Sequence, residues 1–207
     1  MKKLLLVIVA VFITTTVAHS QSTADAKIKQ QINAVASKMQ TMQCDFVQTK
    51  YMKLLNDKMV SQGKMYYQQS DKLRWEYTSP YTYTFVLNGS KVMLNKGKRS
   101  DVINVNQSKF FKEIARIMMN SVVGKCLTDE KDFKVSISST ATQWVATLVP
   151  QRKDMKQMFH KIVLYFSRSA KMVSTVELVE KKGDRTVIQL KNVKTNSPIN
   201  AKVFSVG

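Results

Sequence analysis

The stretch GKMYYQQSDKLRWEYTSPYTYTFVLNGSKVML, residues 63–94, decides the fold of this chain. Large apolar residues alternate with Arg74 and Glu76 over residues 73–77, and with Thr82, Thr84 and Val86 over residues 81–87. Side chains of a strand point to opposite faces with period two, so each run places its aromatic residues on one face. Asn88-Gly89 predicts a hairpin with a type I′ turn, in which both central residues have positive φ. The stretch therefore predicts a curved antiparallel sheet with a large apolar inner face.

Strand patterns continue on both sides of this stretch. A strand from Phe46 is expected to turn near Asn56-Asp57 into a second strand over residues 59–68. Residues 150–158 are interpreted as a basic loop that contains methionine. Further strands are expected over residues 101–105, 133–138, 143–149, 159–167, 171–180, 185–193 and 202–206.

Two segments have helical periodicity. The first starts at a cap on Ser22 or Thr23 and repeats apolar residues at Ile28, Ile32, Val35 and Met39. It cannot bury this stripe alone, so we expect it to lie on the sheet. The second runs from Ser108 to Gly124, and its periodicity is that of an ordinary core helix. Its apolar stripe comprises Phe110, Phe111, Ile114, Ile117, Met118 and Val122.

The N-terminus has the pattern of a secretory signal peptide. Two lysines precede an apolar run over residues 4–13, and the small residues Ala18 and Ser20 follow it. A membrane anchor is the alternative, but the run is shorter than the roughly 20 residues that a spanning helix needs. We predict cleavage after Ser20, with a single exported domain over residues 21–207 in the periplasm.

The composition is strongly basic, with 33 Lys and Arg against 14 Asp and Glu and a net charge of +19. Export argues against nucleic acid as the partner and favours anionic lipid headgroups or acidic protein surfaces. A generally solvated basic surface is the alternative interpretation. Cys44 and Cys126 form either one disulfide or two buried thiols, and the sequence does not choose between them.

The sequence lacks the motifs of the common reaction chemistries. Removal of the signal peptide leaves His160 as the one histidine, and neither Gly-x-Ser-x-Gly nor Gly-x-Gly occurs. Asp129, Glu130 and Asp132 form the tightest carboxylate cluster and are interpreted as solvated charge among lysines. We therefore expect no enzyme, no catalytic residue, no metal site and no cofactor; an exported hydrolase that uses His160 or a carboxylate pair is the alternative.

Several short motifs, taken in order and spacing from residue 28 to residue 206, resemble the periplasmic outer-membrane lipoprotein carriers (LolA-like). They are Phe46-x-Gln48, Gly63, residues 73–77 with Pro80 and Asn88-Gly89 behind them, Leu148-Val149-Pro150, Val176-Glu177-Leu178 with Gly183-Asp184, and Phe204. The resemblance implies a mainly β protein with some α: an unclosed antiparallel β-barrel with helices forming a lid over its concave apolar face.

The resemblance also implies a function. A monomer would bind lipoprotein acyl chains in its cavity, receive them from an inner-membrane ABC transporter complex and pass them to an outer-membrane acceptor, with transient contact to the membrane surface. The implied acyl-binding residues are Leu73, Trp75, Tyr77, Tyr83, Phe85, Phe111, Ile114, Ile117 and Met118. The alternatives are a lipid-binding sensor or interaction module of the cell envelope, and a carrier of another lipid or glycolipid.

One position departs from the family pattern. Family members carry an Arg-Pro pair shortly before the tryptophan that corresponds to Trp75, and the arginine helps to latch the lid. Here Gln69 and Ser70 occupy those positions. Lys72 and Arg74 are the candidates for a substitute charge.

Overall fold

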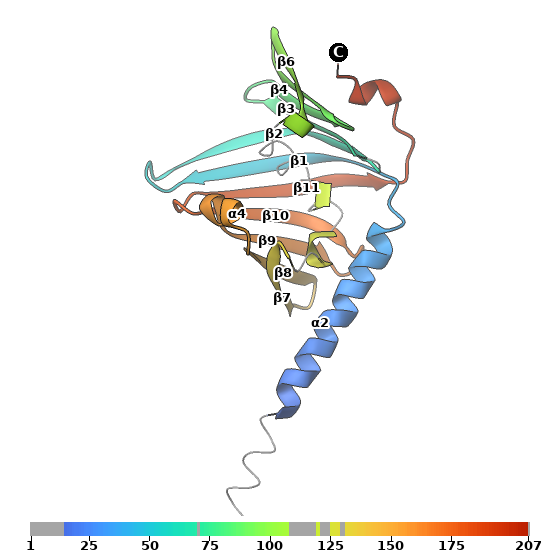
Figure 1. Ribbon diagram of the computed structural model, residues 1–207, viewed down its shortest axis with the longest axis vertical. Coiled ribbons are helices and arrows are strands. Elements are labelled where there is room, and N and C mark those ends of the chain that lie inside the picture. Colours follow the sequence, from blue (N-terminus) through green and yellow to red (C-terminus); the bar gives the residue numbers. More distant parts are fainter. Residues whose placement is uncertain (1–14, 70, 108–118, 121–124, 129–130, 207) are drawn as a thin grey trace, which may run out of the picture.

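The computed structural model describes residues 15–69, 71–107, 119–120, 125–128 and 131–206. Within these residues, eleven strands form one antiparallel sheet in the order β6-β5-β4-β3-β2-β1-β11-β10-β9-β8-β7 (Figure 1). Strands β6 and β7 are its two edges, so the predicted unclosed antiparallel barrel is confirmed. The strands are β1 Thr41–Met52, β2 Asp57–Gln68, β3 Lys72–Ser79, β4 Tyr83–Asn88, β5 Lys91–Lys96, β6 Arg99–Asn104, β7 Phe133–Ser139, β8 Gln143–Pro150, β9 Phe159–Ser167, β10 Met172–Glu180 and β11 Arg185–Thr195.

Helix α2, Thr15–Ala36, packs with its C-terminal half on one face of this sheet, which we call the inner face, and its N-terminal half extends beyond the sheet (Figure 1). The helix begins before the predicted cap at Ser22 or Thr23, because neither Gly nor Pro interrupts it. Cleavage after Ser20 falls inside it and remains a prediction. Most of the second predicted helix lies outside the described residues. Its residues Met119 and Asn120 are described, and both are helical.

The inner face carries two clusters of buried apolar residues. The first includes Met42, Phe46 and Met65 on β1 and β2, and the second lies on β7 to β10. Helix α2 contributes to both, through Ala36 in the first cluster and Ile32 in the second. Of the predicted apolar stripe, Ile32 is buried, Ile28 and Val35 are half-buried, and Met39, which follows the helix, is buried in the first cluster.

The hairpin between β4 and β5 has a different turn from the predicted one. Asn88 pairs with Lys91, so Gly89 and Ser90 form the turn. Gly89 has φ of 60° and Ser90 has no positive φ, which is the pattern of a type II′ turn with Gly in its first central position. The side chain of Asn88 is free for another bond and donates to the Phe204 carbonyl oxygen at 3.0 Å.

Two segments differ from their predicted structure. Residues 150–158, interpreted as a loop, contain helix α4, Lys153–Met158, which buries Met155. The predicted last strand is a 3-10 turn, η3 Ala201–Phe204, because the Asn200 side chain caps it by accepting from the Lys202 backbone N–H. This turn contacts β3 and β4, and Phe204 is fully buried. It covers the outer face, opposite to α2.

The inner face as candidate binding site

Five of the predicted acyl-binding residues lie on the inner face, and they differ in burial. Leu73, Trp75 and Phe85 are 0%, 7% and 7% exposed within the first apolar cluster. Tyr77 and Tyr83 are half-buried and pack against the same cluster. The remaining four, Phe111, Ile114, Ile117 and Met118, lie outside the described residues.

Phe46 organises the aromatic part of this face. Its ring stacks on Trp75 with centroids 4.4 Å apart and meets the edge of Tyr77 at 5.3 Å. Tyr77 in turn lies 6.1 Å from Tyr83, measured between ring centroids. Phe46 belongs to the Phe46-x-Gln48 motif but is not among the predicted site residues. Since Phe46 follows Met42 and Cys44 at intervals of two residues on β1, the strand period itself places its side chain on the same inner face.

A polar contact lies among these aromatic rings. The Tyr77 hydroxyl donates to Gln48 Oε1 at 3.0 Å, so both groups are satisfied on an otherwise apolar surface. Burial raises the pKa of Tyr77 above its ordinary value, and the neighbouring Tyr81 adds to this effect. Tyr77 therefore stays a neutral hydrogen-bond donor at physiological pH.

A band of half-buried apolar residues crosses β10 and β11 between the two clusters. Ile188 packs against the first cluster, Val176 and Leu178 pack against the second, and Leu190 packs against both. We call these four residues the inner-face band. None of the four is among the acyl-binding residues predicted from the sequence. The alternation of Ile188 and Leu190 with polar Gln189 and Lys191 nevertheless indicates a strand with one apolar face.

The substitute charges considered for lid latching are on the wrong side of the sheet. Leu73 and Trp75 point inward, so Lys72 and Arg74 point to the outer face. Arg74 Nε bonds Glu76 at 2.9 Å, and Arg74 Nη1 donates to the Val203 carbonyl at 3.4 Å. Arg74 therefore holds the C-terminal segment and does not face the inner side.

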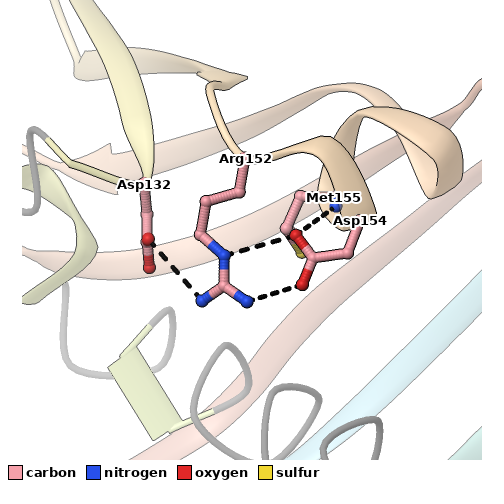
Figure 2. Close-up of polar contacts among 4 residues, drawn as sticks. All are labelled: Asp132, Arg152, Asp154 and Met155. Carbon is pink, nitrogen blue, oxygen red and sulfur yellow. Dashed lines mark hydrogen bonds and ion pairs between the residues drawn. The ribbon is translucent and has the colours of Figure 1, made fainter.

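Asp132 is not the solvated charge that the sequence suggested. It is 7% exposed and pairs with Arg152 at 3.8 Å between Oδ1 and Nη1. Figure 2 shows Arg152 between the Asp132 and Asp154 carboxylates, beside the start of α4. The Gln151 N–H also donates to the Asp132 carbonyl oxygen at 2.7 Å. These contacts tie the start of β7 to α4 and give Asp132 a structural role.

The structure also places the remaining cysteine and histidine candidates of the sequence analysis. Cys44 is a buried free thiol, so it is not bridged to Cys126. His160 is exposed on β9. In the part of the chain that the structure describes, no helix has the length and hydrophobicity to span a bilayer.

Cys44 is expected to resist alkylation in the folded protein. Burial, and secondarily the adjacent Asp45 carboxylate, raises the pKa of Cys44 to about 12, so almost no thiolate exists at pH 8. In a Cys126→Ser background, iodoacetamide should label the folded protein at least about a hundredfold more slowly than the protein in denaturant. Equal labelling rates would contradict the buried position of this thiol.

Comparison with known proteins agrees with this architecture. A family model described as outer membrane lipoprotein carrier protein LolA matches residues 37–207. An outer-membrane lipoprotein carrier protein of Legionella pneumophila (strain Paris) is 29% identical over 205 residues, covering 99% of this chain and 94% of the relative.

Two solved structures share the fold. The complex of Pseudomonas aeruginosa MucA/MucB matches with a TM-score of 0.54 and 12% identity over 87% of this chain and 61% of that chain. An uncharacterized conserved protein from Thermus thermophilus matches with a TM-score of 0.54 and 9% identity, over 87% of this chain and 92% of that chain. These likenesses concern the fold alone. The match of the family model over nearly the whole described domain shows that the chain belongs to the outer-membrane lipoprotein carrier family.

Proposed function

We propose that this protein is a periplasmic carrier whose inner face receives the acyl chains of lipoproteins. In this function it takes a lipoprotein from an inner-membrane ABC transporter complex, shields the acyl chains from water, and passes them to an outer-membrane acceptor. It works as a monomer, performs no catalysis and needs no cofactor. Family membership and the apolar inner face support the proposal.

The half-burial of the inner-face band is the observation that carries this proposal. Ile188, Leu190, Val176 and Leu178 are packed on their sides but keep exposed surface between the two clusters. An acyl chain laid along them would remove that surface from water. Each buried methylene contributes roughly 0.8 kcal/mol, so one long acyl chain gains on the order of 10 kcal/mol against water. Binding of this kind depends on area and not on fixed polar contacts, which suits a cargo that must be released.

Within this proposal, Tyr77 and Tyr83 form the aromatic side of the acyl site, and Leu73, Trp75 and Phe85 form the layer beneath it. The two tyrosines are half-buried, so a guest can reach them, whereas the deeper three are already packed by the protein's own residues. A cargo would contact the deeper three only after α2, which adds Ala36 to this cluster, or Met119 moves away from them.

Native mass spectrometry of the protein recovered from its own cell envelope tests the proposal. We expect a fraction of the molecules to carry bound lipoprotein or lipid, and depletion of the protein to leave lipoproteins in the inner membrane. A uniformly empty protein together with normal lipoprotein sorting would contradict it.

An interaction module of the cell envelope is the second candidate. It is favoured by the shared fold with the chain in the MucA/MucB complex, in which a protein of this architecture is bound to another protein. Depletion separates the two functions. Mislocalised lipoproteins support the carrier, whereas an altered envelope stress response with normal sorting supports the module.

A further inference from the structure

The turn between β1 and β2 exposes two leucines at its tip. Leu54 is 92% exposed and Leu55 is 70% exposed. Met52 pairs with Asp57, so the turn consists of residues 53–56 and the leucines occupy its two central positions. Figure 1 shows this hairpin reaching the end of the sheet opposite to the junction of α2 and β1. Two adjacent, largely exposed leucines cost solubility and add nothing to the core.

The base of this hairpin is held in place. The Lys53 N–H donates to Asp184 Oδ1 at 3.0 Å, in the turn between β10 and β11. Lys50 Nζ pairs with Glu180, the last residue of β10, at 3.2 Å, and the Arg185 guanidinium lies 4.3 Å from the centroid of the Tyr51 ring. The hairpin that carries the two leucines is therefore fixed at its base to the neighbouring β10–β11 hairpin.

Positive charge predominates around the tip, where the exposed carboxylate of Asp57 lies beside Lys58. Lys53 and Lys58 flank the leucines, and Lys181 and Lys182 lie in the adjoining turn; all four are exposed. Among the residues that the structure describes, these lysines form no ion pair, whereas the acidic residues Glu180 and Asp184 are both paired with Lys50. An apolar tip within a collar of unpaired lysines matches an anionic lipid surface, where headgroups attract the lysines and the acyl boundary accepts the leucines.

We propose that the β1–β2 turn, residues 53–56, docks this protein on anionic phospholipid bilayers by inserting Leu54 and Leu55 below the headgroups. A protein partner would need a flat surface of roughly 800 Å² on each side for a stable interface. A four-residue turn with two leucines does not offer such a surface, but a fluid bilayer closes around a narrow tip. The inference deepens the proposed function, on which its biological purpose rests. The docking itself requires no cargo and can be measured apart from acyl binding.

Co-sedimentation with vesicles tests the docking. The exported form of the protein is mixed with phosphatidylcholine vesicles that contain or lack phosphatidylglycerol. We expect binding to the anionic vesicles that weakens as salt rises, and a loss of at least about tenfold in the variant Leu54→Gln/Leu55→Gln. Since both positions are exposed, this variant should keep the melting temperature and the acyl binding of the parent protein.

Val60→Gln is the matched control, because Val60 is 45% exposed on β2 of the same hairpin but lies away from the tip. It should bind vesicles as the parent does. A direct measurement uses Leu55→Trp, whose emission should be quenched by lipids brominated along their acyl chains. Three results would overturn the proposal: unchanged binding of the double leucine variant, an equal loss with Val60→Gln, or no vesicle binding by the parent protein. Failure of acyl binding with intact docking would instead contradict the proposed carrier function alone.

Discussion

Replacing Gly63 with alanine is expected to lower the free energy of unfolding by more than about 3 kcal/mol. Gly63 lies on β2 between Phe46 of β1 and Tyr77 of β3. A Cβ atom at this position would stand 1.9 Å from the Glu76 carbonyl oxygen and 2.5 Å from Cζ of Phe46. The carbonyl belongs to the neighbouring strand, so it cannot move without breaking the β2–β3 pairing, which already shifts register between Gln62 and Gly63.

The measurement is denaturant unfolding of Gly63→Ala beside Gly97→Ala. Gly97 has φ of 68° and no heavy atom within 4 Å of its would-be Cβ, so alanine there costs only the backbone strain of about 1–2 kcal/mol. Equal destabilisation by the two glycine substitutions would show that close strand approach at Gly63 is not the cause.

Replacing Ile188 with aspartate is expected to weaken acyl binding by at least about tenfold while the protein stays folded. Ile188 lies in the inner-face band, opposite Gln48 of β1 and Val176 of β10. It is half-buried, so water still reaches a carboxylate in the empty protein. A bound acyl chain would cover that carboxylate and strip its water, and this cost appears only in the bound state.

Val187→Asp is the control for this prediction. Val187 is the next residue on β11, is also half-buried, and points to the outer face beside Thr49 and Glu177. Displacement of a fluorescent fatty acid, with thermal melting of each variant, measures both properties. We expect the affinity loss for Ile188→Asp and none for Val187→Asp. Equal losses for the two variants would place the acyl site somewhere other than the inner face.

The local pattern of apolar and polar residues was enough to predict many of the strands of this fold. The alternation over residues 73–77 and 81–87 predicts strands β3 and β4, and the same period places Leu73, Trp75 and Phe85 inward. Strand period and turn residues act within a few positions, so they are readable without knowing the partners. The type of the β4–β5 turn escaped this reading because the register, set by Asn88 and Lys91, moved Gly89 into the first turn position.

What the amino-acid sequence determined by itself was thus most of the strands, the inward face of β3 and β4, and the family to which the chain belongs. Only the tertiary structure decided which inward-facing side chains keep surface that a bound molecule could contact. Leu73 and Ile188 have the same period and similar hydrophobicity, yet one is sealed within a cluster and the other lies half-covered between two. Burial depends on which strands become neighbours and where α2 lies, and those are contacts between segments far apart in the chain. The same holds for Arg74, whose partner Val203 lies at the other end of the sequence.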